Sequence, residues 1–174
     1  LLMANFFIKI QNWIIRVVDF FYFPIFRFIP LEIFRYGVTG GINTLFDLLL
    51  YFVFYRYILD MQVVHFGLFA IGPHIAAFFM VFPITFSTGF LLAKYITFTS
   101  SDLKGKIQLF RYGVTVAGAI LLNYVFLKFF VEYAGFYATL SKAITTIIVV
   151  IYSYILQRYF SFKTGKFLIP RKVA

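Results

Sequence analysis

Four basic residues, each followed directly by a tyrosine, are the side chains of this sequence best suited to bind an anion. They are Arg35, Lys94, Arg111 and Arg158, and the tyrosines that follow them are Tyr36, Tyr95, Tyr112 and Tyr159. Arginine and lysine donate charge-assisted hydrogen bonds to phosphate oxygens. Whether the four cations can act on one phosphate depends on the elements that position them.

The composition places these cations in a membrane protein. Hydrophobic residues make up 63% of the 174 positions, charged residues only 13%, and 27 residues are phenylalanine. Soluble domains are about 45–50% apolar and about 25% charged, so a soluble fold of this size could not bury so many apolar side chains. The formal net charge of +10 fits basic cytoplasmic loops or an anionic partner. Because the basic residues flank apolar segments, we expect lipid phosphate and no nucleic acid.

Four stretches are long and apolar enough to cross a bilayer, which takes about 20 mostly apolar residues. The predicted spans are residues 35–57, 72–94, 111–131 and 138–158. Thirteen of the sixteen lysines and arginines lie at one end of these spans, in the N-terminal segment, the 94–111 region and the C-terminal tail. Since cytoplasmic segments collect basic residues, we expect a multi-pass protein of the cytoplasmic (inner) membrane with both termini in the cytoplasm.

Residues 1–30 predict an amphipathic interfacial helix ahead of a four-helix transmembrane domain at 31–174. Polar residues recur every three or four positions, at Asn5, Lys9, Asn12, Arg16 and Asp19. This is a narrow polar stripe on an otherwise apolar helix. Three charges argue against a span, and a helix in the interface with Trp13 in the lipid boundary fits better. No clean apolar run leads to a small-residue cleavage site, so we do not expect a cleavable signal.

The segment Phe-Arg-Tyr-Gly-Val-Thr occurs twice, at 34–39 and 110–115. The offset of 76 residues aligns the first span with the third. An offset of 64 residues aligns LLAKYITF at 91–98 with ILQRYFSF at 155–162. The chain is therefore predicted to be an all-α membrane protein made of two copies of a two-helix hairpin.

The two predicted repeats cover about residues 34–98 and 110–162. Both have one orientation, so we expect parallel repeats related by a pseudo-twofold axis along the membrane normal. This arrangement puts all four cations at the cytoplasmic interface, where they could hold a lipid phosphate. The alternative is that basic and aromatic residues only anchor the helix ends.

Polar residues also occur inside the spans, at Asn43, Asp47, Asn123 and Lys142. Asp47 lies 12 residues beyond Arg35, or roughly 18 Å along a helix at ~1.5 Å per residue. An acid at that depth costs about 2.5–3.5 kcal/mol on insertion scales, so it should face the bundle interior or water and have a partner. The functional hypothesis is a polar path for a lipid head group. The alternatives are a protonated, packed acid and a polar clasp between the first and third spans.

Several kinds of site are missing from the sequence. There is no phosphate-binding GxxxxGK[S/T] loop and no pair of acids or nucleophile–base set. With no cysteine and two histidines, we expect neither a metal nor a cofactor. The loops between the spans are short, so we do not expect an extramembrane catalytic domain or an enzyme.

These features together resemble the GtrA-like family of small four-helix membrane proteins, over about residues 33–163. The resembling segments are RYGVTGG at 35–41 with Asn43 and Asp47, AKYITF at 93–98 and QRYFSF at 157–162. Ala93 and Gln157 stand where asparagine is common in the family, and Tyr95 and Tyr159 lie one place before the usual aromatic residue. The basic residues follow the family pattern.

The resemblance implies a role in handling polyprenyl-phosphate-linked sugars. Family members are thought to move the lipid carrier, with or without its sugar, across the cytoplasmic membrane, and others work beside polyprenyl-phosphate glycosyltransferases. Their products modify O-antigen, teichoic acid or arabinogalactan. We therefore expect a translocator of lipid-linked monosaccharide, with the carrier and membrane lipids as partners. A glycosyltransferase and a second copy of the chain are further candidate partners.

Two other functions fit the sequence. The chain could anchor and regulate a cytosolic glycosyltransferase without transport, and then the loop 99–109 and the tail 163–174 would matter most. It could instead recycle bare polyprenyl phosphate from the outer leaflet, with Lys128 or Lys142 as an outer phosphate contact.

Overall fold

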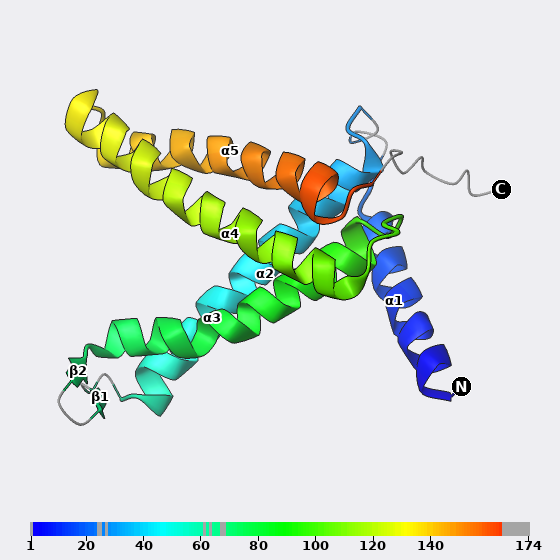
Figure 1. Cartoon of the computed structure of the whole chain (residues 1–174), viewed down its shortest axis with the longest axis horizontal. Coiled ribbons are helices and arrows are strands. Elements are labelled where there is room, and N and C mark those ends of the chain that lie inside the picture. Colours follow the sequence, from blue (N-terminus) through cyan, green and yellow to red (C-terminus); the bar gives the residue numbers. More distant parts are fainter. Residues whose placement is uncertain are drawn as a thin grey trace. The chain divides into compact units, whose positions relative to one another are not determined.

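The regular secondary structure of the described residues is helical apart from one small hairpin (Figure 1). The chain divides into two compact units. A computed structural model describes residues 2–23, 26, 28–60, 62, 64–66 and 69–164. Unit 1 falls within Leu1–Thr97 and unit 2 within Phe98–Leu168. The predicted fold class is confirmed, because an N-terminal helix precedes four candidate transmembrane helices. The pseudo-twofold repeat arrangement and the domain boundaries stay predictions.

Unit 1 contains the N-terminal helix, two long helices and the hairpin. Its elements are α1 (Leu2–Phe20), α2 (Leu31–Val53) followed by the π-helical turn η2 (Phe54–Ile58), strands β1 (Val64–Phe66) and β2 (Phe69–Ile71), and α3 (Pro73–Leu92) followed by the π-helical turn η3 (Ala93–Thr97). The strands pair antiparallel, with His65 opposite Ala70, where the sequence predicts only a connector. α2 packs along α3 and η3, and α1 contacts α2 and η3.

Proline residues set where the long helices of unit 1 begin. α2 starts directly after Pro30, whose backbone is extended (φ −54°, ψ 138°). α3 starts with Pro73, at a position where the missing N–H has no helical partner to lose. Glu32 lies in the first turn of α2, at the positive end of the helix dipole. The start after Pro30 places Arg35 in the second turn of α2.

Unit 2 consists of two long helices, each ending in a π-helical turn. They are α4 (Gly105–Lys128) with η4 (Phe129–Tyr133), and α5 (Ala138–Leu156) with η5 (Gln157–Ser161). α4 packs along α5 and η5. Phe98 and Phe162 are fully buried, and their stacked rings lie 5.0 Å apart. These rings form a core beside η5, the turn that carries Arg158.

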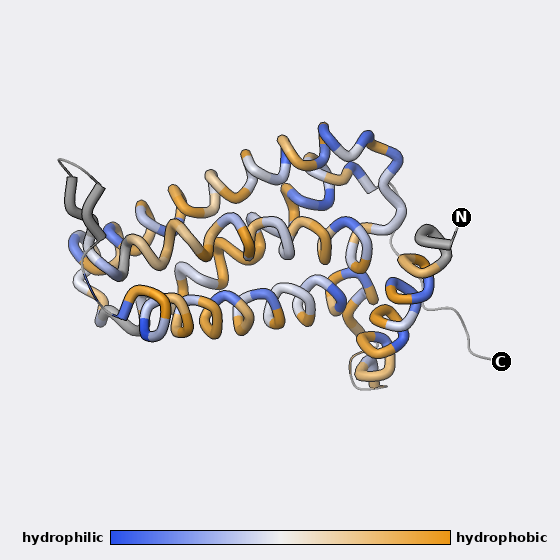
Figure 2. The backbone as a smooth tube through the Cα atoms, turned by 90° about the horizontal axis from the view of Figure 1, so that it is seen from below, coloured by the Kyte–Doolittle hydropathy of each residue, from blue (hydrophilic) through white to orange (hydrophobic). Residues whose placement is uncertain are grey.

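Four helical stretches of the described chain are long and apolar enough to cross a membrane. They are Leu31–Ile58, Ala76–Thr97, Gly105–Tyr133 and Ala143–Ser161. They match the four predicted spans, although the first and third helices begin earlier, at Leu31 and Gly105. Hydrophobic residues predominate along the long helices (Figure 2). Many of their large apolar side chains are exposed, as expected for helices surrounded by lipid.

Candidate functional site

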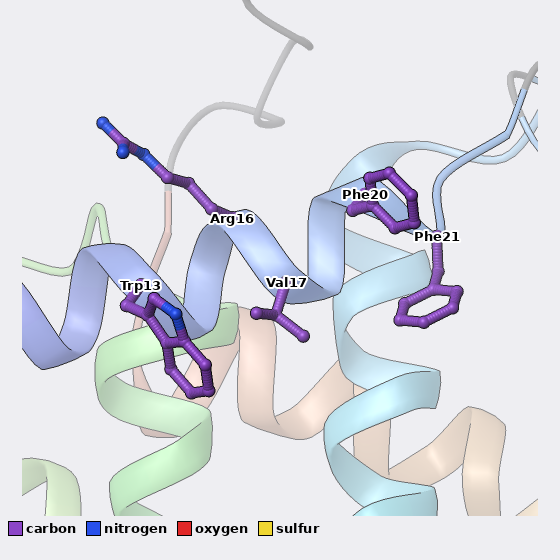
Figure 3. A pocket seen from close by; sticks show the side chains of 5 residues that line it. All are labelled: Trp13, Arg16, Val17, Phe20 and Phe21. Carbon is purple, nitrogen blue, oxygen red and sulfur yellow. The ribbon is translucent and has the colours of Figure 1, made fainter.

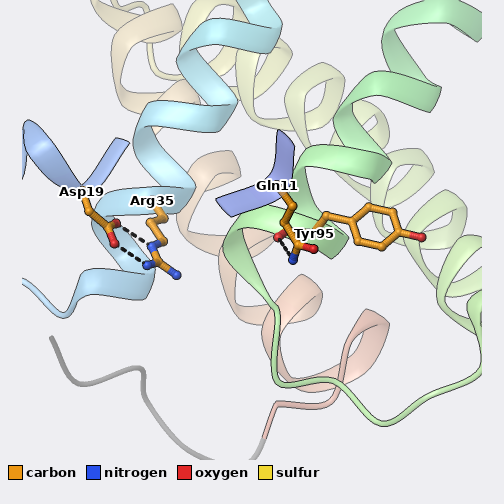
Figure 4. Close-up of polar contacts among 4 residues, drawn as sticks. All are labelled: Gln11, Asp19, Arg35 and Tyr95. Atoms are coloured by element: carbon orange, nitrogen blue, oxygen red, sulfur yellow. Dashed lines mark hydrogen bonds and ion pairs between the residues drawn. The ribbon is translucent and has the colours of Figure 1, made fainter. Parts of the chain in front are cut away.

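The guanidinium of Arg35 is held by a carboxylate of the N-terminal helix. Nε of Arg35 donates to Oδ1 of Asp19 over 2.8 Å, and Nη2 donates to Oδ2 over 2.6 Å (Figure 4). The side chain of Arg35 is 9% exposed and that of Asp19 is 33% exposed. A bidentate pair of this kind fixes the plane of the guanidinium and balances its charge. Arg35 is therefore positioned by α1 and already has an anionic partner.

Lys94 lies beside the second polar contact between α1 and the rest of unit 1. Nε2 of Gln11 donates to the main-chain oxygen of Tyr95 over 2.9 Å (Figure 4). The Lys94 ammonium lies 5.1 Å from the centre of the Tyr95 ring and 5.9 Å from that of Phe90. Both distances are within cation–π range. Lys94 is half-buried, so its charge stays reachable from outside the unit.

In each unit a pair of hydroxyls joins the helices that carry the cations. In unit 1, Oγ1 of Thr39 lies 3.0 Å from Oγ1 of Thr97 and donates to the main-chain oxygen four residues earlier over 2.7 Å. In unit 2, Oγ1 of Thr115 lies 2.9 Å from Oγ of Ser161 and donates to the main-chain oxygen four residues earlier over 3.0 Å. All four residues are buried. The hydroxyl pairs therefore fix the helix ends on which the cations lie.

The two predicted cations of unit 2, Arg111 and Arg158, differ in how far an external anion can reach them. Nη1 of Arg111 donates to the main-chain oxygen of Phe160 over 3.0 Å, and the guanidinium carbon lies 5.0 Å from the Phe160 ring centre. Arg111 is half-buried and makes no ion pair within the described part of the chain. Arg158 is 2% exposed, and its Nη1 donates to the hydroxyl of Tyr154 over 3.4 Å. Of these two arginines, Arg111 is therefore the reachable one.

Gln108 ties the start of α4 to the loop before it. It is 2% exposed, and its Nε2 donates to Oγ of Ser101 over 2.9 Å. The Ser101 hydroxyl in turn donates to the main-chain oxygen of Phe162. The equivalent position in unit 1, 76 residues earlier, is the fully buried Glu32. A neutral amide in unit 2 thus stands where unit 1 has an acid.

Each unit brings two of the four predicted cations to one end of its helix pair. These are Arg35 and Lys94 in unit 1, and Arg111 and Arg158 in unit 2. That all four share one plane at one membrane face stays a prediction. Sequence reasoning places Asp19 only in the polar stripe and misses it as the partner of Arg35. The available signal was that Asp19 is the single acid of that stripe.

Asn43 makes a polar clasp inside unit 1. Its Oδ1 accepts a hydrogen bond from Oγ1 of Thr88 over 2.7 Å, and its Nδ2 donates to the main-chain oxygen of Thr85 over 3.2 Å. The clasp joins α2 to α3. Asp47, one turn further along α2, is half-buried and has neither a hydrogen bond nor an ion pair with any described residue. The partner expected for this acid is therefore not among those residues.

The remaining polar residues predicted to lie within the spans are on the helices of unit 2. Asn123 is on α4 and is half-buried. Lys142 is on α5, and its side chain lies outside the described residues. Lys128, the other predicted outer contact, has a 44% exposed side chain whose ammonium lies 3.9 Å from the carboxylate of Glu132. The polar path and the clasp between the first and third spans stay predictions.

One face of α1 is apolar and exposed. Trp13, Arg16, Val17, Phe20 and Phe21 line an open groove of about 450 Å³ on this face (Figure 3). Trp13 is 67% exposed and Phe20 is 73% exposed. The helix predicted from the polar stripe is present, and its exposed aromatic rings suit the lipid boundary. Its location in the membrane interface stays a prediction.

Comparison with known proteins places the sequence in a family. The chain matches the family GtrA/DPMS, transmembrane domain, over residues 35–162, whereas no curated protein and no solved structure matches it. Together with the four candidate transmembrane helices, the match indicates a multi-pass membrane protein of the lipid-linked sugar pathway, in a family of small transmembrane proteins that are generally not catalytic. Because the matched residues make up most of the chain and include all four predicted cations, the chain belongs to the GtrA/DPMS transmembrane domain family.

Proposed function

We propose that the protein translocates a polyprenyl-phosphate-linked monosaccharide across the cytoplasmic membrane, for the modification of cell-surface polysaccharides. The observation that carries the proposal is the reachable guanidinium of Arg111 at the end of a membrane-length helix pair. Its one hydrogen bond among the described residues goes to a main-chain oxygen, so its other N–H groups remain available to a lipid phosphate. Family membership supplies the lipid-linked sugar pathway.

The four cations divide into a reachable pair and a buried pair. Lys94 and Arg111 are half-buried, whereas Arg35 is 7% exposed and Arg158 is 2% exposed. We assign the first contact with a phosphate to the reachable cation of each unit, Lys94 in unit 1 and Arg111 in unit 2. Each side chain of this pair lies over an aromatic ring, which limits its freedom and so lowers the entropy lost on binding. Arg158 adds positive charge behind the helix ends of unit 2, whereas the charge of Arg35 is balanced by Asp19.

Asn43, Asp47, Asn123 and Lys142 form the proposed path for the sugar head group. Ionised carboxylates accept hydrogen bonds from hydroxyl groups such as those of a sugar. Asp47 is the acid of α2 that can do so, since it has no polar partner in the described chain. No nucleotide-binding loop occurs in the sequence, so the proposed movement is downhill and follows consumption of the sugar on the far side.

The proposed topology puts both termini in the cytoplasm, with the basic helix ends at the inner leaflet. The polyprenyl carrier and membrane lipids are the primary partners. A polyprenyl-phosphate glycosyltransferase that loads the carrier and a second copy of the chain are further candidates. The chain itself is proposed to perform no chemical step.

Flipping by the purified protein in liposomes tests this function. The liposomes carry a fluorescent polyprenyl-phosphate monosaccharide in both leaflets, and a membrane-impermeant quencher measures how fast the inner pool becomes reachable. We expect protein-dependent flipping that Asp47→Ala slows on the order of tenfold, through loss of a charged hydrogen-bond acceptor. Asp60→Asn is the control, because Asp60 is exposed and lies beyond the first span.

Two results would contradict the proposal. One is flipping of a fluorescent phosphatidylcholine at the same rate, because the phosphate-binding cations would then give no selectivity for the carrier. The other is a folded protein that flips nothing. If such a protein co-purifies with a glycosyltransferase, the anchoring function replaces transport.

A further inference from the structure

We infer that α1 is a latch, in which the Asp19 carboxylate occupies the place on Arg35 that the phosphate of the lipid carrier takes when the latch opens. The identity of the ligand rests on the proposed function. Carboxylate and phosphate both offer a guanidinium two acceptor oxygens in the same fork-like arrangement. They therefore compete for one arginine, and α1 docked on unit 1 is the closed state.

The geometry of the ion pair favours this competition. Asp19 takes both Nε and Nη2 of Arg35, at 2.8 Å and 2.6 Å (Figure 4). The side chain of Arg35 is 9% exposed, whereas that of Asp19 is 33% exposed. The carboxylate thus lies on the solvent side of the pair. A second anion reaches the fork of Arg35 when Asp19 withdraws.

α1 is held on unit 1 by few side chains, so its docking is reversible. Val18 is the buried residue of α1 among positions 6–20, whose side chains are described. Among the described residues, the polar contacts that hold α1 are the pair with Arg35 and the bond from Gln11 to the main chain of Tyr95. The opposite face carries the exposed aromatic groove (Figure 3), which keeps a released α1 in the lipid interface.

Unit 2 shows which contacts the equivalent arginine makes where no carboxylate of a preceding helix is bound to it. Arg111, equivalent to Arg35 through the offset of 76 residues, donates to a main-chain oxygen and has no carboxylate partner in the described chain. The latch also lies outside residues 35–162, the part that matches the family. The latch is therefore formed by a helix outside the matched domain, and it acts on one of the two units.

The single tryptophan of the chain makes the latch directly observable. Trp13 is on α1, so intrinsic tryptophan fluorescence, and its quenching by brominated lipids, reports on this helix alone. The full chain in phosphatidylcholine nanodiscs is titrated with polyprenyl phosphate. We expect a saturable change in Trp13 fluorescence as the carrier displaces Asp19 and α1 moves.

Two variants weaken the latch by independent routes. Asp19→Asn keeps the shape of the side chain but removes the competing charge, and should lower the midpoint of the titration by about 2- to 5-fold, as expected for a partly exposed ion pair. Gln11→Ala removes the other polar contact without touching Arg35, and should lower the midpoint by roughly twofold. Asp60→Asn removes an exposed carboxylate elsewhere in unit 1 and should leave the midpoint unchanged.

The latch is overturned if carrier binding leaves Trp13 fluorescence unchanged, or if Asp19→Asn and Gln11→Ala both keep the wild-type midpoint. Binding of radiolabelled polyprenyl phosphate and flipping in liposomes are measured in parallel. Wild-type flipping without a latch response would contradict the latch alone, and a latch response without flipping would contradict transport alone. Inorganic phosphate should leave the fluorescence unchanged, and an equal response to it would overturn the lipid carrier as the ligand.

Discussion

Unit 1 and unit 2 join the ends of their helix pairs by matching contacts. The hydroxyls of Thr39 and Thr97 lie 3.0 Å apart in unit 1, and those of Thr115 and Ser161 lie 2.9 Å apart in unit 2. The offsets of 76 and 64 residues found in the sequence map the first pair onto the second. The two units therefore share the contact that sets the spacing of their helix ends.

What differs between the units is the charge around the equivalent arginines. Arg35 is bound by Asp19, whereas Arg111 donates to a main-chain oxygen. Buried Glu32 in unit 1 is replaced by buried Gln108 in unit 2. Unit 1 thus carries its own anions, and unit 2 keeps a positive charge for an external one. A duplicated scaffold can keep its packing contacts while its charges diverge, because neutral hydroxyls make the helix–helix contact.

Of the two predicted cations in each unit, the reachable one does not lie on the equivalent helix. In unit 1 it is Lys94, at the end of the second long helix, and in unit 2 it is Arg111, on the first. The partners of these two in each unit, Arg35 and Arg158, are buried. Of the four predicted cations, each unit therefore presents one outward and holds one inside, although the sequence treats all four as equal.

Removing the equivalent arginine from each unit gives the largest expected effect. Arg111→Ala should weaken polyprenyl-phosphate binding by roughly 10- to 100-fold, because a hydrogen bond to a charged group contributes about 1.5–3 kcal/mol. Arg35→Ala should weaken it by only about 2- to 5-fold, because a phosphate that gains Arg35 must first displace Asp19. Equilibrium binding of radiolabelled carrier to the protein in nanodiscs measures both.

The matched control for these two variants is Arg56→Ala. Arg56 is exposed and lies in η2, at the other end of the first span from Arg35. We expect binding at the wild-type level. Equal losses for Arg111→Ala and Arg35→Ala would mean that Asp19 does not distinguish the two units, and the charge comparison would fail.

The fold and the positions of the cations could be predicted from sequence because their signals are local. The length of an apolar span is set by bilayer thickness, and four such helices are present. The doubled hexapeptide predicts equivalent surroundings for Thr39 and Thr115, and these two hydroxyls do make matching contacts. Local composition thus identifies the helices and the residues at their ends.

Contacts between distant segments could not be predicted in this way. Arg35 and Asp19 are 16 residues apart, and the break between α1 and α2 separates them, so no helical period relates their faces. Gln11 and Tyr95 are 84 residues apart. The strands β1 and β2 have three residues each, too few for a clear alternating pattern. The sequence therefore shows where the cations lie along the chain but not which one is neutralised.

The units also differ in packing, because a small residue of one unit corresponds to a larger residue of the other. In unit 2, a Cβ on Gly118 would collide with the hydroxyl of Tyr152 and lie 3.0 Å from its Cζ. The equivalent positions of unit 1 are Ile42 and Thr88. Gly118→Ala should destabilise the protein by about 1–3 kcal/mol, the usual effect of overpacking a close contact. Unfolding of the purified protein in mixed micelles measures this.

Gly41→Ala is the control for Gly118→Ala. A Cβ on Gly41 would meet nothing within 4 Å, so the variant should be as stable as the wild type. Tyr152→Phe removes the colliding hydroxyl and should restore part of the stability lost in Gly118→Ala. Wild-type stability of Gly118→Ala alone would show that the two helices of unit 2 do not depend on this close approach.

The smallest expected effect comes from the clasp of Asn43 and Thr88, whose equivalents in unit 2 are Ala119 and Tyr152. Asn43→Ala should destabilise the protein by about 0.6–1.7 kcal/mol, the range of hydrogen bonds between membrane helices. Thr88→Val should have a similar effect, and the double variant should lose less than the sum, because both residues share one bond. Unfolding in mixed micelles measures the three variants, and strict additivity would contradict a shared bond.

The flipping rate of Asn43→Ala tests whether the clasp of unit 1 also serves transport. A wild-type rate would confine Asn43 to packing and leave Asp47 as the polar group of α2 that serves the head group. A slowed rate would show that unit 1 uses its clasp in transport, a role that Ala119 cannot take in unit 2.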